Sequence, residues 1–274
     1  MLDSSFEQFL CEFCCVPTKN VFSHFYRCPN CGNLFNLNHQ TTSYEDSYFE
    51  GEYEKQYGKT YIDDKSNIQK RMKLRLEQVR PFIQYAKHKK LLEIGSAAGF
   101  FLELASAAGF LAKGWEISKY MSDYANEHGS PTIQGDFLNL LQEESRNEYD
   151  MICAFYVIEH FKEQKEIWKG LSRIIRDNGL LILALPSTFG PAFYYHQDNW
   201  IKNHPRDHFI DYSPFGIKKV CSVFGFKLLH IYPEGLHPER FLFGNSVLLK
   251  SFYTMIQKLF NFSDTMFLIL QKKV

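Results

Sequence analysis

Short apolar segments alternate with amphipathic segments along residues 89–185, and this alternation constrains the fold more than any other feature of the sequence. Strands are predicted at Leu91–Ile94, Phe110–Glu116, Pro131–Gln134, Tyr149–Phe155 and Gly179–Leu185. Helices are predicted between them, the first ending at Ala108 and the others at Lys119–His128, Phe137–Glu144 and Ile158–Arg176. Buried strands that are each followed by a helix form parallel sheets with helices on both faces. The sequence therefore predicts an α/β fold.

Further elements are predicted on both sides of this alternation. Apolar residues with helical spacing, at Ile68, Met72, Leu76, Val79 and Ile83, predict a helix from Ser66 to about His88. Residues 186–212 are rich in Pro, Gly, Asn, His and aromatic residues, and we expect this insertion to be an active-site lid without regular structure. A helix, a strand, a helix and a strand are then predicted at Ser213–Phe224, Phe226–Ile231, Ser246–Phe260 and Thr265–Leu270.

The charge balance argues against one class of function, strong electrostatic binding of nucleic acid. The 274 residues include 31 Lys and Arg against 31 Asp and Glu, so the formal net charge is zero. Strong electrostatic binding of nucleic acid needs surplus basic residues. Apolar runs such as Leu180–Leu185 are far shorter than the ~20 residues that span a bilayer. The first ten residues have an early acid and no basic region, so we expect no secretory signal and a cytoplasmic location.

Five of the seven cysteines lie in the first 31 residues. The two CxxC pairs are Cys11 with Cys14 and Cys28 with Cys31. Two such turns supply a tetrahedral set of four thiolates for Zn²⁺, which leaves no open position for a catalytic water. We therefore expect residues 1–40 to form a zinc-ribbon-like module with a structural Zn²⁺. Cys15 and His24 are alternative ligands, and reduced thiols without metal are the competing interpretation.

The segment LLEIGSAAGFFLELA, residues 91–105, combines a strand, a glycine-containing turn and the start of a helix. Gly95 and Gly99 allow the backbone to approach a ligand at the helix N-terminus. The first three predicted strands end at acidic residues, namely Glu93, Glu116 and Asp136. An acid at the end of the second strand is placed to accept hydrogen bonds from ribose hydroxyls. Asp136 is placed to bind an adenine amino group.

These motifs resemble those of a known family. EIGSAAGFFL, WEIS, GDF and YDMICAFYVIEHF are similar to the successive motifs of class I S-adenosylmethionine-dependent methyltransferases, over about residues 66–274. The resemblance implies a Rossmann-like, seven-stranded, mostly parallel sheet whose last strand is antiparallel. It also implies that Glu93 and Gly95 approach the methionine moiety of the cofactor, Glu116 the ribose, Asp136 and Phe137 the adenine, and Phe155 and Tyr156 the sulfonium. Ser96, Ala97, Gly99, Phe100 and Ile117 complete the expected cofactor-binding set.

One residue of the cofactor turn departs from the family pattern, because Ala97 stands where the family usually has glycine. We expect this change to tighten the cofactor pocket or to lower its affinity for the cofactor. The competing cofactor is a dinucleotide, whose G-x-G-x-x-G fingerprint is not supplied by Gly95, Ala97 and Phe100. S-adenosylmethionine is therefore the favoured cofactor.

Two pairs of residues are candidates for the base that takes the acceptor proton. Glu159 and His160 follow the fourth strand, where orienting the next helix and packing beneath the cofactor are the alternative roles. Asp207 and His208 lie in the insertion, within a DHF run. This run resembles the Glu-His-Phe run of sugar methyltransferases with an N-terminal zinc module, in which the His is the favoured base. Hydrogen bonding within the loop is the alternative role for His208.

Residues 41–88 are predicted to be a Tyr-rich connector and linker helix, which join the module to a methyltransferase domain at 89–274. Tyrosines recur along the connector at Tyr48, Tyr53, Tyr57 and Tyr61. This stretch resembles the YxxxY segment that crosses the cofactor mouth in zinc-module methyltransferases, so Tyr57 is included in the cofactor-binding set. A helix face of packed tyrosines is the alternative.

The sequence therefore predicts methyl transfer from S-adenosylmethionine to a small-molecule acceptor. The resemblance implies a saccharide or nucleotide-linked sugar, with O-methylation favoured. The alternatives are an RNA or ribosomal methyltransferase that holds RNA through the zinc module, and a cofactor-binding protein without catalysis. We expect the helix at 246–260 to cover a sheet edge, with contact at a membrane surface as the alternative. The sequence indicates no oligomeric state.

Overall fold

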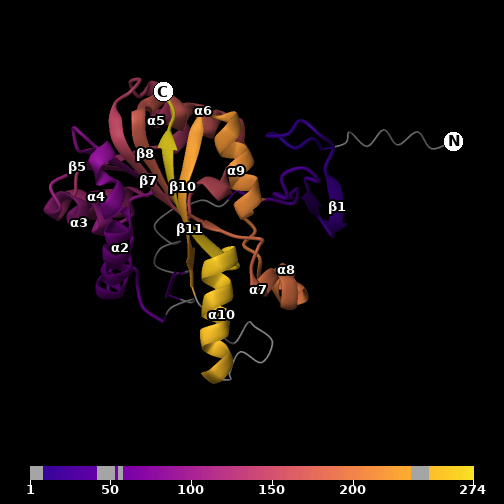
Figure 1. The fold of residues 1–274 in the computed structure, drawn as a ribbon. Coiled ribbons are helices and arrows are strands. Elements are labelled where there is room, and N and C mark those ends of the chain that lie inside the picture. Colours follow the sequence, from indigo (N-terminus) through magenta and orange to yellow (C-terminus); the bar gives the residue numbers. More distant parts are fainter. Residues whose placement is uncertain (1–8, 42–52, 55–57, 236–246) are drawn as a thin grey trace.

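A computed structural model describes residues 9–41, 53–54, 58–235 and 247–274. Figure 1 shows a central sheet with helices on both sides, and a smaller module beside it. The strands of the central sheet are β4 (Lys90–Ile94), β5 (Leu111–Glu116), β6 (Thr132–Gln134), β7 (Tyr149–Phe155), β8 (Ile175–Pro186), β10 (Phe226–Glu234) and β11 (Thr265–Lys272). The helices around it are α2 (Lys65–Val79), α3 (Phe100–Ala107), α4 (Lys119–Glu127), α5 (Phe137–Glu143), α6 (Gln164–Ile174), α9 (Pro214–Val223) and α10 (Val247–Phe260).

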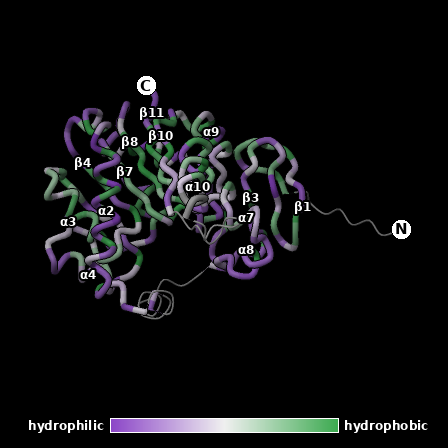
Figure 2. The backbone as a smooth tube through the Cα atoms, turned by 60° about the horizontal axis from the view of Figure 1, so that its bottom comes forward, coloured by the Kyte–Doolittle hydropathy of each residue, from purple (hydrophilic) through white to green (hydrophobic). Residues whose placement is uncertain are grey.

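The central sheet has seven strands in the order β10-β11-β8-β7-β4-β5-β6. The strands from β8 to β6 pair in parallel, and β11 is antiparallel to both β8 and β10. The predicted Rossmann-like, mostly parallel sheet with an antiparallel last strand is therefore confirmed. β7 is buried along almost its whole length, and β8 is apolar and buried from Leu180 to Leu185, as expected for strands that helices cover on both faces. Figure 2 shows these hydrophobic strands enclosed by the helices.

The predicted continuous helix at Ile158–Arg176 is wrong. A short 3-10 helix spans Ile158–His160, α6 follows at Gln164–Ile174, and β8 already begins at Ile175. The buried side-chain amide of Gln164 donates hydrogen bonds to the carbonyls of Ile158 (2.7 Å) and Phe161 (2.8 Å). These bonds satisfy backbone acceptors at the break between the two helices.

The predicted linker helix is also shorter than expected. α2 ends at Val79, and a 3-10 helix continues over Arg80–Tyr85. Pro81 is the physical reason, because its ring removes an amide donor and clashes with the carbonyl of the preceding turn of an α-helix. The chain then enters β4, so the linker leads directly to the strand that precedes the cofactor turn.

The insertion at 186–212 has regular structure, which corrects the prediction of a structureless segment. It contains α7 (Pro191–Tyr195), α8 (Gln197–Asn203) and β9 (Ile210–Asp211). The N-terminal module contributes β1 (Lys19–Phe22), β2 (Phe25–Arg27) and β3 (Leu34–Asn36), and β9 extends its antiparallel sheet in the order β1-β2-β3-β9. The insertion therefore joins the module to the central domain through shared strand pairing, and α7 and α8 lie beside the module in Figure 2.

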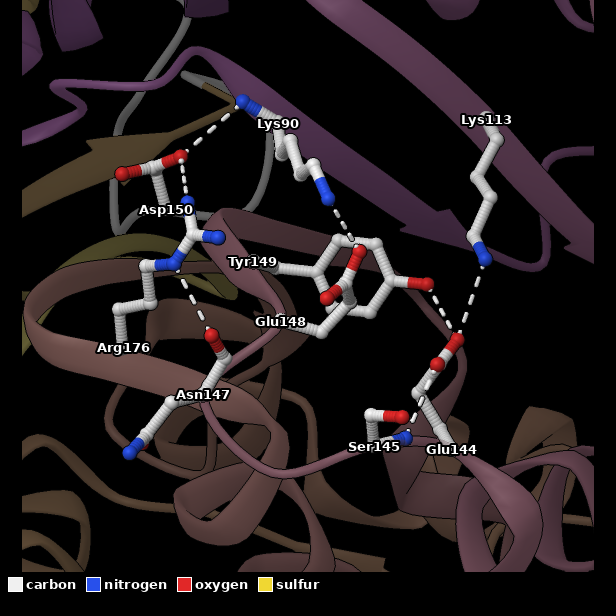
Figure 3. A network of polar contacts seen from close by, with 9 residues as sticks. All are labelled: Lys90, Lys113, Glu144, Ser145, Asn147, Glu148, Tyr149, Asp150 and Arg176. Carbon is white, nitrogen blue, oxygen red and sulfur yellow. Dashed lines mark hydrogen bonds and ion pairs between the residues drawn. The ribbon is translucent and has the colours of Figure 1, made fainter.

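The amino end of the central sheet carries a network of paired charges (Figure 3). Buried Asp150 accepts hydrogen bonds from the backbone N–H groups of His88 (3.2 Å) and Lys90 (3.1 Å), and it pairs with Arg176 (2.9 Å). The Lys90 ammonium pairs with Glu148 at 2.6 Å. Each carboxylate in this group has a partner, so the network fastens β4, β7 and β8 to one another.

α10 projects beyond the edge of the sheet in Figure 1. Its Phe252, Met255 and Leu259 side chains are exposed, whereas Gln257 is buried and donates a hydrogen bond to Ser263 Oγ (3.3 Å). None of the helices that the structure describes is both long and apolar enough to cross a membrane. Contact of this helix with a membrane surface stays a prediction.

Candidate active site

The turn between β4 and α3 is fastened to the end of β5. The N–H groups of Gly95 and Ser96 donate to the carbonyl of Trp115 (2.8 and 3.2 Å). The N–H of Ala97 donates to Glu116 Oε2 at 2.7 Å. The turn and the acid at the end of the next strand therefore form one unit.

The backbone of this turn explains its glycines and the departure at Ala97. Gly95 and Gly99 have positive φ angles of 69° and 75°. A Cβ atom on Gly95 would lie 2.5 Å from Val157 Cγ2, and one on Gly99 would lie 2.5 Å from Ser130 Cβ. Ala97 also has a positive φ, 43°, and a residue with a side chain pays about 1 kcal/mol for that conformation. The usual glycine of the family fits the conformation that Ala97 adopts.

Two buried carboxylates lie beside the turn and differ in their partners. Glu116 accepts hydrogen bonds from the N–H groups of Ala97 and Ser118 (2.9 Å). Glu93 is 4% exposed, and its Oε2 atom has no hydrogen-bond partner among the residues that the structure describes. Burial raises the pKa of Glu93 well above its usual value, and the charge of Glu116 adds to this rise. A buried acceptor without a partner indicates the position of a ligand donor, and the ammonium group of S-adenosylmethionine fits that requirement.

The described part of the Tyr-rich connector lies against this turn. Tyr61 stacks on Phe100, with ring centroids 5.6 Å apart and planes 7° apart, and Tyr53 meets Tyr61 edge-on at 5.1 Å. Burial raises the pKa of Tyr61, and the charges of Glu93 and Glu116 contribute to the rise. The Tyr61 phenol is therefore near both carboxylates. Tyr48 and Tyr57 lie outside the described residues.

The predicted adenine-binding residues differ in their exposure to solvent. Asp136 is exposed and caps α5, because its Oδ1 accepts the N–H of Asn139 at 3.0 Å. Phe137 is buried in the core, where it contacts Trp115 and Phe161 at ring distances of 6.2 and 5.3 Å. Ile117 is exposed. Asp136 thus caps a helix and Phe137 packs in the core, whereas the Ile117 side chain is accessible. Contact of these three residues with the cofactor stays a prediction.

Sequence reasoning missed a buried cation beside the predicted sulfonium pocket. Arg75 of α2 forms an ion pair with Glu234 (2.6 Å) and donates to the Tyr156 hydroxyl (3.2 Å). Its guanidinium lies 4.7 Å from the centre of the Phe155 ring. The signal was present in the sequence, since Arg75 falls three residues after Met72 on the apolar face of its helix. Phe155 and Tyr156 are thereby fixed at the carboxyl end of β7.

His160 and Asp207, two of the predicted catalytic residues, form a pair. His160 Nδ1 lies 3.4 Å from Asp207 Oδ2 and 3.1 Å from the Asp207 carbonyl oxygen. Burial disfavours the imidazolium form, but the hydrogen bond and charge of Asp207 and the charge of Glu159 raise the pKa of His160 above its usual value. The acid that adjoins His208 in sequence therefore supports a different histidine.

His208 instead faces a buried acid of β9. Its Nδ1 atom lies 3.9 Å from Asp211 Oδ1, while His204 Nε2 lies 2.7 Å from Asp211 Oδ2. Burial opposes ionisation of Asp211, but the charge and hydrogen bond of His204 and the charge of His208 hold its pKa well below the usual value. The His208 ring also lies 4.7 Å from that of His160. The insertion and the end of β7 thus build one histidine cluster.

Glu159 lies beside this cluster and is fully buried. Within the described part of the chain, both of its carboxylate oxygens lack hydrogen-bond partners. Burial raises the pKa of Glu159, although the charges of His160 and His208 act in the opposite direction. The cluster therefore combines imidazoles with an unsatisfied carboxyl group, which is a suitable environment for binding an acceptor and moving its proton.

The four predicted zinc ligands come together in the N-terminal module. All four sulfur atoms lie within 4.8 Å of one another, namely those of Cys11, Cys14, Cys28 and Cys31. The Sγ atoms of Cys11 and Cys31 are 3.7 Å apart, close to the ~3.8 Å expected between thiolates of a tetrahedral zinc site. The donor set therefore fits Zn²⁺. Cys15 is exposed and free.

Two groups of histidine and acidic residues also bring atoms that could bind a metal ion within 4.8 Å of one another. They are Glu159, His160 and His208, and His204, His208 and Asp211. Their internal pairs account for part of this proximity, since Asp211 contacts His204 and His208 directly. We interpret both groups as proton-handling parts of the histidine cluster.

Comparison with known proteins identifies the family. A family model described as a methyltransferase domain matches residues 66–231. The chain belongs to this methyltransferase family. The match begins in α2 and includes the cofactor turn, both buried carboxylates beside it, and the histidine cluster. The resemblance to class I S-adenosylmethionine-dependent methyltransferases is thereby confirmed.

Solved methyltransferases share the fold. An S-adenosylmethionine-dependent methyltransferase from Archaeoglobus fulgidus has a TM-score of 0.59 at 19% identity, covering 83% of this chain and 100% of that one. Magnesium protoporphyrin IX methyltransferase from Synechocystis PCC 6803, with bound S-adenosylhomocysteine, has a TM-score of 0.57 at 12% identity, covering 83% and 97%. These similarities concern the fold alone.

One curated relative shows sequence similarity. The C-methyltransferase NovU of Streptomyces niveus is 23% identical over 153 residues, which cover 54% of this chain. The match spans 35% of the length of that relative.

Proposed function

We propose that this chain transfers a methyl group from S-adenosylmethionine to a small-molecule acceptor held by the histidine cluster. The supporting observation is that buried carboxylate oxygens without a hydrogen-bond partner among the described residues occur at two neighbouring places on the carboxyl edge of the sheet. Glu93 lies by the cofactor turn, and Glu159 lies by the histidines. A chain that keeps such groups has donors to bind at both places.

The cofactor roles follow from the contacts around the turn. Glu93 receives the ammonium group of the methionine moiety, and Glu116 receives the ribose hydroxyls in exchange for its bond with the N–H of Ala97. Ile117 offers an apolar surface to the adenine, and Tyr61 covers the turn from outside. Bound S-adenosylmethionine supplies an electrophilic methyl group on a positively charged sulfur.

The histidine cluster provides the base. His208 takes the proton of the acceptor hydroxyl as the oxygen bonds to the methyl carbon and the carbon–sulfur bond breaks, its electron pair remaining on sulfur. Asp211 stabilises the imidazolium that forms, because it is already ionised and directed toward His208. The His160 and Asp207 pair holds the opposite wall of the cluster.

A saccharide is the acceptor that we favour, with O-methylation as the reaction. Several imidazoles and carboxylates in one cluster suit a ligand that carries many hydroxyl groups. C-methylation is the second candidate, and the similarity to NovU favours it. An RNA acceptor has less support, because the chain has no net positive charge.

The test of this function follows methyl transfer from labelled S-adenosylmethionine to a panel of free and nucleotide-linked sugars. His208→Ala should lower kcat at least 100-fold, because general-base catalysis contributes about 10²–10⁴ in rate. His230→Ala, on the exposed face of β10, is the matched control. Equal turnover by His208→Ala and the unaltered protein would show that His208 is not the base.

We also propose that the four cysteines hold a structural Zn²⁺. Metal analysis of the purified chain should give one zinc per chain, and Cys31→Ser should lose it. Because β9 belongs to the sheet of the module, zinc removal should also disturb the histidine cluster while S-adenosylhomocysteine still binds. A folded, active chain without metal would contradict this assignment.

A further inference from the structure

The outward face of α10 is apolar. Phe252, Met255 and Leu259 stand at positions i, i+3 and i+7, which places them on one face of the helix, and their side chains are between 48% and 66% exposed. On the opposite face, buried Gln257 donates hydrogen bonds to Ser263 Oγ (3.3 Å) and to the carbonyl of residue 235 (3.4 Å). The helix is therefore attached to the domain through a polar side chain and presents large apolar side chains to solvent.

Two other helices extend this apolar surface. Phe260 at the end of α10 lines one concave site together with Phe215 at the start of α9 and Tyr194 of α7. Each of these three side chains is more than half exposed. We name the whole surface the apolar face, and it consists of Phe252, Met255, Leu259, Phe260, Phe215 and Tyr194. Soluble proteins rarely expose a continuous apolar surface of this kind unless it binds something.

The charges next to the apolar face are positive. Exposed Lys218 lines the same concave site, and exposed Lys258 precedes Leu259 on α10. No carboxylate lines this site in the described part of the chain, and α9 and α10 contain four lysines and no acidic residue. A second copy of the chain on this face would bring like charges together. An anionic surface is complementary to it.

We propose that the apolar face docks the chain on an anionic lipid surface. The Phe, Leu and Met side chains enter the acyl layer, the Tyr194 hydroxyl stays among the headgroups, and the lysines pair with anionic lipids. α10 projects beyond the sheet in Figure 1. A lipid layer deforms around a projecting apolar helix, whereas a protein partner needs a groove of its own to receive one.

The apolar face lies at the carboxyl end of the central sheet. β10 runs in the same direction as β8, because β11 is antiparallel to both. α10 follows β10 in the chain, and α7 follows β8. Glu234 at the end of β10 also pairs with Arg75, which donates to Tyr156 at the end of β7. A chain docked through the apolar face therefore holds the end of the sheet with the cofactor turn toward the lipid surface.

Sedimentation of the full chain with lipid vesicles tests this proposal. The chain should bind vesicles made of equal parts of phosphatidylcholine and phosphatidylglycerol, and should bind vesicles of phosphatidylcholine alone at least tenfold more weakly. Lys218→Gln combined with Lys258→Gln should weaken binding to the anionic vesicles at least fivefold, because each lysine near an anionic surface contributes to attraction.

The apolar contribution is tested with a matched pair of variants. Phe252→Gln combined with Leu259→Gln should weaken binding to the anionic vesicles at least tenfold, because both side chains lose apolar area that the lipid would bury. The control is Leu74→Gln combined with Leu111→Gln, which changes two exposed leucines of α2 and β5. The control should bind as the unaltered chain does.

Thermal unfolding shows that each variant is folded, so the outcomes do not depend on methyl transfer. The inference is wrong if the folded, unaltered chain stays in the supernatant with anionic vesicles, if it binds both kinds of vesicle equally, or if Phe252→Gln with Leu259→Gln leaves binding unchanged. If vesicles are not bound and light scattering detects a dimer that the same two substitutions dissociate, the apolar face is an interface between copies of the chain instead.

Discussion

Buried acids at the two ends of the central sheet differ in their hydrogen bonding. At the amino end, Asp150 accepts two backbone N–H groups and an arginine, as Figure 3 shows. At the carboxyl end, one oxygen of Glu93 and both oxygens of Glu159 have no partner among the described residues. Both sets of side chains are buried, so burial alone does not distinguish them.

The difference separates structural acids from functional ones. A buried carboxylate with complete hydrogen bonding fastens strands together, whereas one without partners costs free energy of folding. A chain retains the second kind where a ligand supplies the missing donors.

The largest effect on stability is expected at the amino end. Asp150→Ala removes the partner of two backbone donors and of Arg176, and should lower the free energy of unfolding by about 3 kcal/mol. Asp177→Ala is the matched control, because its carboxylate is 52% exposed and pairs with Lys272. Urea unfolding measures the free energy of unfolding of both variants. A loss at Asp150 no larger than that at Asp177 would show that the network is not structural.

At the carboxyl end, Glu159→Gln should stabilise the protein at neutral pH. Burial raises the pKa of Glu159 in the folded state, so the folded chain holds this proton to a higher pH than the unfolded chain. The free energy of unfolding therefore decreases as the pH rises above about 4.5. The Gln variant lacks this decrease and should be about 1 kcal/mol more stable at pH 8.

Urea unfolding of both proteins from pH 4 to pH 8 provides the comparison. The two stabilities should approach each other at the acidic end of this range. If the Gln variant is less stable than the unaltered chain at pH 8, Glu159 is a paired structural acid, and the contrast between the two ends of the sheet is lost.

The smallest effect is expected in the cofactor turn. Ala97→Gly relieves a positive φ angle and should raise the free energy of unfolding by about 0.5–1 kcal/mol. Ala112→Gly, in the extended backbone of β5, should lower it by a similar amount. Thermal unfolding distinguishes the two signs, and destabilisation by Ala97→Gly would contradict the interpretation of this turn.

The fold and the cofactor turn were predictable because each depends on local sequence. Alternating strands and helices specify a parallel sheet, and the acids at the strand ends follow from where those strands stop. Pro81 and Gln164 set boundaries that periodicity does not detect, since one removes a backbone donor and the other bonds to carbonyls across a break in the helix.

The histidine cluster was predictable only in part. The residues His160, Asp207 and His208 are evident in the sequence, but their partners depend on β9 joining the module sheet. That pairing turns Asp211 toward His204 and His208 and leaves Asp207 for His160. A two-residue strand carries too little pattern to be recognised in sequence, so the arrangement required the structure.

Calorimetric titration with S-adenosylhomocysteine tests the central claim most directly. The unaltered chain and Glu148→Gln, which changes an acid at the amino end, should bind with the same micromolar Kd. Glu116→Ala should weaken binding at least 100-fold, equivalent to about 2.7 kcal/mol. Equal binding by all three proteins, or no binding by the folded unaltered chain, would show that the carboxyl end of this sheet is not the cofactor site.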